Sequence, residues 1–399
     1  MSGQPLPLEG VVVLDLTRVL VGPYCTMMMQ DLGARIIKIE MPGSGDDSRT
    51  FGPFLKDISL YFASINRGKE SLSLNLKSPE GKAILEKLVA KADVLVENYR
   101  PGTMEKLGLG YDRLAEINPR LIYAAASGFG HTGPDSRKPA YDILAQARGG
   151  VMSITGWPDG QPTRVGLSFG DLAAALFTAT GINAALYERE KTGKGQKIDV
   201  SMLDCQVALL ENALVRYQVD GESPKPLGHR HPTITPFQAV KARDAYIVIA
   251  VGNDSLWERF CHAIDHPELL EDPRFKTNPD RCRHVGELDT LLADIFKDQD
   301  ASVWLQILDA ATIPSAPIND VERLMQDPQI LARDMIVELE DQHLGGVKVA
   351  GNPIKMTHVP ETGKRGAVPA VGEHSDAILS ELLGCDTDAI AELRKSGAI

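Results

Sequence analysis

The fold class is decided by the stretch Val11-Val-Val-Leu-Asp-Leu16 and the residues that follow it. This short apolar run has the composition of a buried strand, and residues 24–32 then show helical spacing that stops at Gly33. A second strand follows, Arg35-Ile-Ile-Lys-Ile-Glu40. A strand, a helix and another strand within 30 residues predict a βαβ unit, and therefore an α/β fold with a parallel sheet.

The alternation continues for the next hundred residues. Ser78 precedes a proline and a glutamate, which predicts a capped helix that runs to Ala92. Strands are expected over 93–98, 120–125 and 196–200, with helices over 112–117, 141–147, 172–189 and 202–219. The first βα turn offers only Gly22, so the dinucleotide-binding glycine pattern is absent and an NAD site is not predicted.

The chain of 399 residues is long for one hydrophobic core, and its amino-acid composition changes near Gly221. A Pro- and Gly-rich linker leads to two expected strands within 237–250, joined at Arg243-Asp244, and to a helix from Ser255. We therefore expect a large domain over 1–225, a smaller α+β domain over 226–325, and a segment over 326–399 that returns to the large domain. The tail carries expected strands over 335–339 and 347–350 and an amphipathic last helix.

Composition limits the partners of this protein. The net charge of -12 argues against a nucleic-acid or anionic-membrane partner. The five cysteines are scattered without a CxxC pair, which is typical of reduced thiols in the cytoplasm and predicts no metal site. The sequence shows no signal peptide, and we expect no run of 18 apolar residues that could span a bilayer.

Asp171 is the main candidate for chemistry. It ends the stretch Gly166-Leu-Ser-Phe-Gly-Asp171 and stands directly before a long, Ala-rich apolar run. A carboxylate there would lie at the positive end of a helix, ionised at neutral pH, and could form an acyl intermediate without an activating base. The alternative is that Asp171 only caps the helix. Backbone N–H groups of Gly252-Asn253 or of Gly149-Gly150 could stabilise an oxyanion.

Other candidates are weaker. His229 and His231 lack a third metal ligand at usable spacing, so ordinary loop residues are expected there. His131 lies in a glycine-rich loop, where it could serve as a general acid or base or be merely solvated. Cys25 at the start of a helix could be activated, although a core thiol is the alternative. The GxSxG and GxxxxGK[ST] motifs of triad hydrolases and P-loop proteins are absent.

The order of the motifs resembles one family. The segments Leu14-Asp-Leu-Thr-Arg-Val-Leu-Val-Gly-Pro23 and Asp31-Leu-Gly-Ala34 are similar to the opening of class III CoA-transferases, which include formyl-CoA:oxalate CoA-transferase. The similarity extends to Asn66-Arg67, Val96-Glu-Asn98, Gly128-Phe-Gly-His-Thr-Gly-Pro134, Gly170-Asp171, Thr192-Gly-Lys-Gly195, Pro236-Phe-Gln-Ala239 and Pro317-Ile-Asn319. It covers nearly the whole chain.

The resemblance implies an architecture and a reaction. The large domain would be Rossmann-like and built from the N- and C-terminal segments, with the small domain inserted, and two chains would form interlocked rings as a homodimer. Asp171 would take an acyl group from acyl-CoA as a mixed anhydride and then carry CoA as an aspartyl thioester. Acyl-CoA and a small carboxylic acid would be the substrates, and no cofactor would be bound permanently.

The resemblance also implies site residues. It assigns Val19, Leu20 and Val21 to the thiol end of CoA, and Tyr141 to the substrate. Positions that hold the adenine, ribose and phosphates match Leu74, Lys77, Asn98, Tyr99, Lys106, Leu107 and, with a shift of one residue, Lys138. Met41 stands where the formyl-CoA enzyme has an arginine, and Leu20 where it has a glutamine.

Within the family, the racemase branch carries a histidine-aspartate pair where this chain has Tyr141-Asp142. A tyrosine is a poor base for an α-proton, so a transferase function is favoured over that of an acyl-CoA racemase or isomerase. The region around Arg18 most resembles succinyl-CoA:glutarate CoA-transferases. We hypothesise that Arg18 clamps the distal carboxylate of a dicarboxylic acid; the alternative is that it pairs with a neighbour such as Asp15.

Overall fold

The structure, a computed structural model, describes residues 5–359 and 363–399. Contacts between Cα atoms divide the chain into two units. The first combines Met1–Val151, Arg164–Val215 and Pro328–Ile399, and the second combines Met152–Thr163 and Arg216–Asp327. The smaller unit thus starts ten residues before the border expected at 226 and takes in a further segment, 152–163, because Trp157 packs edge-on against His229.

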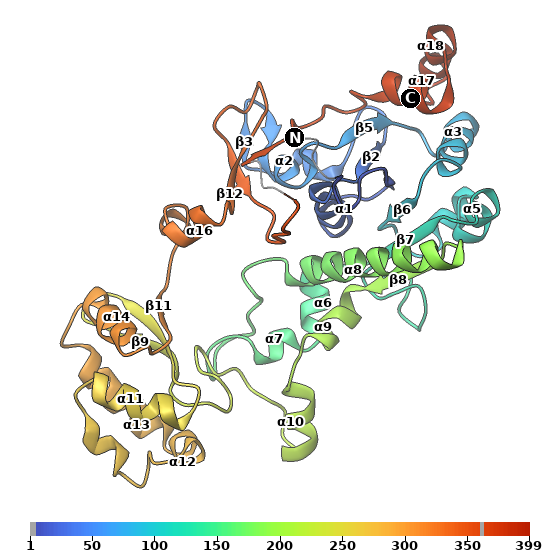
Figure 1. Cartoon of the computed structure of the whole chain (residues 1–399). Helices are drawn as coiled ribbons and strands as arrows, with labels where there is room; N and C mark the ends of the chain where they lie inside the picture. Colours follow the sequence, from blue (N-terminus) through green and yellow to red (C-terminus); the bar gives the residue numbers. More distant parts are fainter. Residues whose placement is uncertain (1–4, 360–362) are drawn as a thin grey trace. The chain divides into compact units, whose positions relative to one another are not determined.

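The first unit is built on a six-stranded sheet in which every neighbouring pair is parallel (Figure 1). Its spatial order is β5-β2-β1-β6-β7-β8. In chain order this is 3-2-1-4-5-6, the order of the Rossmann fold, with the switch point between β1 and β6. The strands are β1 Val12–Asp15, β2 Arg35–Glu40, β5 Glu70–Ser73, β6 Val94–Glu97, β7 Ile122–Ser127 and β8 Lys197–Ser201.

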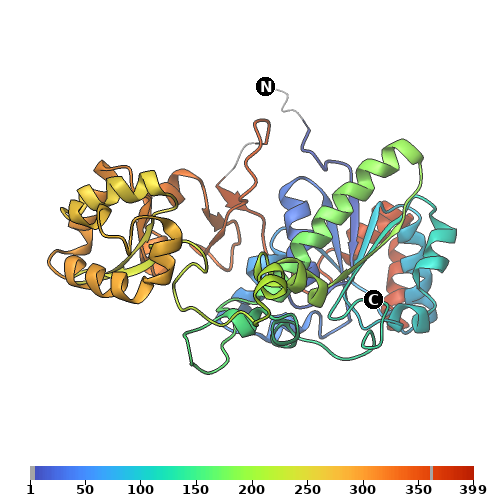
Figure 2. The same cartoon turned by 90° about the horizontal axis from the view of Figure 1, so that it is seen from below.

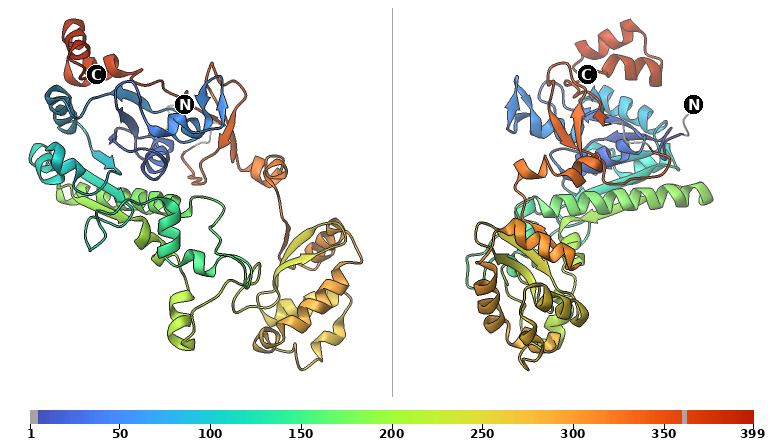
Figure 3. Two further views of the ribbon diagram at one scale, coloured as in Figure 1. Left: turned by 180° about the vertical axis from the view of Figure 1, so that it is seen from behind. Right: turned by 60° about the vertical axis from the view of Figure 1, so that its left-hand side comes forward.

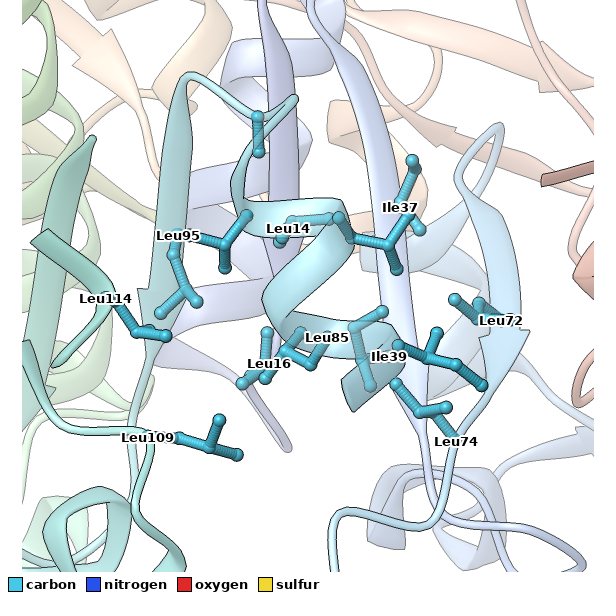
Figure 4. Packing of buried hydrophobic residues seen from close by; sticks show 14 of the residues in the cluster. Leu14, Leu16, Ile37, Ile39, Leu72, Leu74, Leu85, Leu95, Leu109 and Leu114 are labelled. Atoms are coloured by element: carbon cyan, nitrogen blue, oxygen red, sulfur yellow. The ribbon is translucent and has the colours of Figure 1, made fainter. Parts of the chain in front are cut away.

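Alternating strand residues build two separate cores, one on each face of the sheet. Leu14, Ile37 and Leu95 point to one face, where α3 (Pro79–Val89), α4 (Thr103–Leu107), α5 (Tyr111–Ile117), α17 (Ser375–Leu383) and α18 (Thr387–Lys395) cover them (Figure 4). Val13 and Val94 point to the other face, against α1 (Val21–Asp31) and α8 (Phe169–Thr192). Figure 2 shows α8 and the C-terminal helices on opposite sides of the sheet.

The C-terminal segment from Pro328 completes the first unit. Helix α17 contacts α3 and β5, and Figure 3 shows α17 and α18 beside α3. A small sheet of order β13-β12-β14 precedes them. The remaining elements are η1 Asp47–Thr50, β3 Phe54–Leu55, β4 Ile58–Ser59, α2 Leu60–Asn66, α6 Asp142–Arg148, α9 Met202–Ala208, α16 Pro328–Ala332, β12 Ile336–Leu339, β13 Lys348–Ala350 and β14 Lys364–Arg365; α7 Val151–Ile154 and α10 Ala213–Asp220 cross the unit borders.

The second unit has its own sheet and its own core. Its antiparallel order is β11-β10-β9, and the expected pair of strands joined at Arg243-Asp244 is confirmed. Trp257, Phe260, Phe296 and Trp304 stack in series in the core. The elements are β9 Phe237–Lys241, β10 Tyr246–Ala250, α11 Asp254–Ala263, η2 Pro267–Leu270, α12 Asn278–Arg283, α13 Val285–Phe296, α14 Ala301–Ala310, β11 Ser315–Pro317 and α15 Val321–Leu324.

Three expectations need correction. The helix expected over 202–219 is two helices, α9 and α10, because Glu211 between them adopts a positive φ of 53°. Strand β5 has a mixed polar sequence without a strand pattern, so it escaped prediction. Helix α8 is long and apolar enough to cross a membrane by length and composition alone, contrary to the expectation for this chain, but half of that stretch is buried inside the protein.

The buried Lys69 links the end of β1 to the start of α1. Lys69 Nζ lies 3.0 Å from Asp15 Oδ2 and also donates to Thr26 Oγ1, Asn66 Oδ1 and the Pro23 carbonyl. Burial opposes the charge on Lys69 and lowers its pKa to about 8, while Asp15 acts in the opposite direction. The nearby ammonium groups hold the pKa of Asp15 well below its usual range despite burial.

Removing Lys69 should therefore be costly. In Lys69→Met, the Asp15 carboxylate stays buried without its closest counter-charge, and we expect the free energy of unfolding to fall by about 3–5 kcal/mol in urea denaturation. Lys395→Met, which removes an exposed lysine of α18, is the control and should change it by less than about 0.5 kcal/mol. A similar small loss in Lys69→Met would contradict the role given to this pair.

Candidate active site

The carboxyl ends of the central strands enclose a pocket of about 250 Å³. Residues that follow β1, β6, β7 and β8 line it, and the first turn of α8 contributes Asp171. It lies at the switch point of the sheet, where open α/β folds bind their ligands. The topology alone therefore marks this pocket as the candidate site.

The pocket brings together nine of the predicted residues. They are Arg18, Val19, Leu20, Val21, Asn98, Tyr99, Lys138, Tyr141 and Asp171. Leu74, Lys77, Lys106 and Leu107 do not line it. Leu74 is a core residue, whereas Lys77 and Lys106 are exposed. Gly252 and Asn253 belong to the second unit, where the Asn253 side chain caps α11 by accepting from Leu256 N, so their predicted oxyanion role stays a prediction.

The loop after β1 is fixed by side chains from two other segments. Asn98 Oδ1 accepts from Arg18 N at 2.9 Å, and Asn98 Nδ2 donates to the Arg18 carbonyl at 2.7 Å. Val19 N donates to Asp46 Oδ1 at 3.1 Å. These bonds hold Val19 at a φ of 66°, a conformation that a β-branched residue rarely adopts. The Val19 backbone is thus strained and held in place at the mouth of the pocket.

The buried Lys38 also holds the loop after β1 in place. Its buried Nζ lies 2.8 Å from Asp46 Oδ2 and donates to the Thr17 carbonyl at 2.9 Å. The surrounding carboxylates raise the pKa of Lys38, so this ammonium group stays charged although it is buried. The Lys38 charge in turn lowers the pKa of Asp46 against the effect of burial. The pocket loop therefore rests on a buried ion pair.

Arg18 lies at the pocket with a partner other than the one considered from the sequence. Its Nη1 is 3.0 Å from Asp47 Oδ2, and the guanidinium carbon lies 5.6 Å from the centre of the Tyr99 ring. Asp15 is not the partner, because it is buried and bound to Lys69. Both Arg18 and Asp47 are about half exposed, so a ligand carboxylate can replace Asp47 at little cost.

Asp171 is not the cap of α8. The helix begins at Phe169, three residues earlier than expected, with Ser168 as the N-cap residue, and Asp171 is the third residue of the first turn. The cap is instead supplied by another helix, because Gly170 N donates to Asp142 Oδ1 at 2.7 Å. The capping alternative for Asp171 is therefore wrong, and its carboxylate is left facing the pocket.

The charge state of Asp171 also differs from expectation. The sequence argument supposed a carboxylate held ionised by the helix dipole. Burial and the nearby Asp142 carboxylate instead raise the pKa of Asp171 to about 7. A carboxyl group with this pKa is half ionised at neutral pH and, once ionised, is a stronger nucleophile than an ordinary aspartate.

Two features at the same edge escaped the sequence argument. Burial, with contributions from Asp171, Asp46 and Asp142, raises the pKa of Tyr61 to about 12, which places this phenol in the electrostatic surroundings of the pocket. Burial also raises the pKa of Glu97 to about 7, and Glu97 Oε2 accepts from Tyr99 N at 2.7 Å. Neither residue carries a local pattern that would have revealed it.

The remaining candidates form no second site. His131 Nδ1 lies 3.1 Å from Lys197 Nζ, and its Nε2 is 3.8 Å from Glu97 Oε1. His229 packs against Trp157, and burial raises the pKa of the Cys25 thiol far above its usual range. Within residues 5–359 and 363–399, no group of three His, Cys, Asp or Glu side chains is arranged to hold a metal ion.

The comparison with protein families decides the family of this chain. The model of CoA-transferase family III matches residues 8–375. The chain belongs to CoA-transferase family III. The family predicted from the sequence motifs is confirmed, and the protein is an enzyme that uses CoA thioesters as substrates.

Relatives of this CoA-transferase match along almost its whole length. It is 47% identical to an acetyl-CoA:oxalate CoA-transferase of Acetobacter aceti over 94% of this chain and 95% of the relative. It is 40% identical to the human succinyl-CoA:glutarate CoA-transferase, over 98% and 90%. The crystal structure of a CAIB/BAIF family protein from Brucella suis superposes with a TM-score of 0.84 at 38% identity, covering 95% of this chain and all of that one.

The raised pKa of Asp171 in this CoA-transferase has a measurable effect on stability. Between the ordinary pKa of 3.8 and about 7, the folded state keeps a proton that the unfolded state has lost, so stability falls as pH rises through this window. Asp171→Asn removes this loss. We expect the variant to match the wild type near pH 4 and to exceed it above pH 7, by up to about 4 kcal/mol, in thermal and urea unfolding.

The control is Asp112→Asn, which removes an exposed carboxylate from α5. Its stability relative to the wild type should stay constant across the same pH range. An Asp171→Asn variant that shows no pH-dependent gain would contradict the raised pKa.

Proposed function

We propose that this protein transfers CoA from an acyl-CoA donor, with succinyl-CoA as the leading candidate, to a small dicarboxylic acid through a covalent intermediate on Asp171. The observation that carries the proposal is the position of Asp171. Its carboxylate lines the pocket at the switch point and is released from the capping role by Asp142. Its raised pKa makes it a suitable nucleophile for reversible acyl exchange.

The reaction uses four exchanges at carbonyl carbons. An oxygen of ionised Asp171 attacks the thioester carbonyl, CoA thiolate leaves, and a mixed anhydride forms. The thiolate attacks the aspartyl carbonyl, which releases the donor acid and leaves an aspartyl-CoA thioester. The acceptor carboxylate then attacks this thioester, giving a second anhydride and CoA thiolate. Attack of the thiolate on the acceptor carbonyl yields the new acyl-CoA and restores Asp171.

Two observations support a dicarboxylic acceptor. The two relatives are named for oxalate and glutarate, which are both dicarboxylic acids of different length. The pocket offers a matching cation, since Arg18 lines it and is paired with the half-exposed Asp47. A distal carboxylate could form a bidentate pair with Arg18, while the other carboxylate reaches Asp171.

The cations of the pocket suit a polyanionic thioester. Arg18, Arg100 and Lys138 line it, and Asn98 and Tyr99 form the wall after β6. By family resemblance, we assign Val19, Leu20 and Val21 to the thiol end of CoA. The exposed Lys77, which follows β5, and the exposed Lys106, which follows β6, are assigned with Leu74 and Leu107 to the nucleotide end, beyond the pocket itself.

We further propose that the active form is a homodimer in the cytoplasm. The exposed side of α8 carries Leu176, Phe177 and Tyr187 at helical spacing. A second copy of this chain would cover this apolar stripe and so explain why a helix apolar enough for a membrane is only half buried. The scattered free cysteines are consistent with a reducing compartment.

The covalent step can be tested by intact mass. When the protein is mixed with succinyl-CoA and no acceptor, we expect an adduct on the wild type that hydroxylamine removes, because both the anhydride and the thioester of Asp171 are activated acyl groups. Asp171→Ala should form none. If the wild type forms no adduct with succinyl-, acetyl- or oxalyl-CoA, the proposal fails; solvent deuterium uptake α to the thioester would then identify an isomerase.

The clamp can be tested by substitution of Arg18. In Arg18→Ala, the KM for glutarate or oxalate should rise by about ten-fold to a hundred-fold, the effect of losing one charge-assisted pair, while the KM for the acyl-CoA donor changes less. Arg394→Ala on α18 removes an exposed, ion-paired arginine elsewhere and should leave both values unchanged. An unchanged KM for dicarboxylic acids in Arg18→Ala would rule out the clamp.

A further inference from the structure

The start of α8 is closed by a residue from a different helix. The first N–H groups of a helix lack partners within it, and they are usually satisfied by the side chain of the N-cap residue. Here the Ser168 side chain makes no cap bond. Asp142, the first residue of α6, accepts from Gly170 N instead, at 2.7 Å. The bonded N–H is one residue before Asp171.

A buried amide holds Asp142 in this pose. Gln146, one turn further along α6, donates from Nε2 to Asp142 Oδ2 at 2.7 Å. Its Oε1 accepts from Val165 N at 2.9 Å. Gln146 is fully buried, so it ties Asp142 to the segment that leads into α8 without competition from water. The two helices are close enough that a Cβ on Gly170 would lie 3.1 Å from Asp142 Oδ1.

We propose that Asp142 is a positioning residue for Asp171: it binds the N–H before Asp171, aims the Asp171 carboxylate at the substrate, and is itself held by Gln146. This inference rests on the proposed role of Asp171 as the nucleophile. Asp142 does not act as a catalytic group in it, because its two oxygens are already bound to Gly170 N and Gln146 Nε2.

The cap also controls the charge at this helix end. The positive end of α8 would stabilise an ionised Asp171, but the Asp142 carboxylate occupies the N–H and adds a like charge. Burial first, and Asp142 second, account for the raised pKa of Asp171. Asp142 therefore works against the helix dipole and keeps the nucleophile basic. The nearest cation to Asp142 is Arg164, 3.9 Å from its Oδ2 and itself partly exposed.

Other ionisable groups face the same region and must stay constant in a test. On the pocket wall they are Arg18, Asp47, Arg100, Lys138 and Tyr141. Tyr61 on α2 responds to the charge of Asp171, and Asp204 and Cys205 lie on α9, which packs against α8. A substitution at Asp142 leaves all of them in place, so a changed titration of Asp171 reports on Asp142.

Asp142→Asn is the direct test. Its amide oxygen can still accept from Gly170 N, but the charge is lost. We expect the acid limb of the pH–rate profile, near pH 7 in the wild type, to move down by about one pH unit or more, because a like charge beside Asp171 has gone. The rate on the plateau should fall about ten-fold, since the new amide NH₂ faces the NH₂ of Gln146.

The double variant Asp142→Asn, Gln146→Glu separates the positioning of Asp171 by Asp142 from the effect of the Asp142 charge. The glutamate can accept from both the asparagine amide and Val165 N, which re-forms the chain of hydrogen bonds. We expect the plateau rate to recover to within about three-fold of the wild type. This difference in activation free energy is smaller than the typical net contribution of one hydrogen bond. Asp112→Asn on α5 is the matched charge control and should leave both the acid limb and the plateau unchanged.

Two results would overturn the inference: an acid limb that stays in place in Asp142→Asn, or a double variant whose plateau does not recover. The carboxyl ¹³C signal of Asp171, assigned by its loss in Asp171→Asn, provides a readout that needs no turnover. If the wild type forms no covalent adduct, the proposed nucleophile fails. The shift of the Asp171 titration in Asp142→Asn still decides whether Asp142 sets the charge at the start of α8.

Discussion

The structure of the site depends on two buried ion pairs, Lys69 with Asp15 and Lys38 with Asp46. Both lysines belong to segments that enter or form the sheet. Each also donates to a backbone carbonyl, Lys69 to Pro23 in the first turn of α1 and Lys38 to Thr17 in the loop after β1. Buried ion pairs do not by themselves add much stability, because desolvation offsets their attraction. Their contribution here is positional: Thr17 and Val19 can adopt only the conformation in which the charges and carbonyls are all satisfied.

The site then combines two kinds of support. The loop after β1 is held by polar anchors, Asn98 and Asp46, that come from neighbouring turns. Asp171 is held by helix packing, through the contact of α6 with the first turn of α8. The loop that carries Arg18 and the helix that carries Asp171 are thus held by different contacts. They meet at the carboxyl ends of the parallel strands because the sheet order places β1 next to β6.

Much of this arrangement could be predicted from the sequence, since periodicity and order of elements determine a parallel sheet, and the apolar strands β1, β2 and β6 were readable. Strand β5 was not, because it is polar: the Ser71 hydroxyl is satisfied by the buried Glu40 carboxylate, a contact that leaves no hydrophobic pattern in the sequence. The capping alternative for Asp171 is wrong for a similar reason. A local pattern suggests Asp171 as the cap, whereas the actual cap, Asp142, lies 28 residues before Gly170, whose N–H it binds, and can only be found in three dimensions. The same holds for Tyr61 and Glu97, whose pKa values are raised mainly by burial in the folded protein.

The capping of α8 from α6 has a consequence for how such an enzyme can diversify. Because Asp171, the proposed nucleophile, is held by helix contacts, the loops that shape the rest of the pocket can accept substitutions without displacing it. Natural selection could then exchange one acceptor acid for another through changes in loop residues such as Leu20 or Arg18, while the chemistry is inherited intact. A scaffold of this kind separates the evolution of specificity from the preservation of reactivity, which fits a family whose members are named for acids as different in length as oxalate and glutarate.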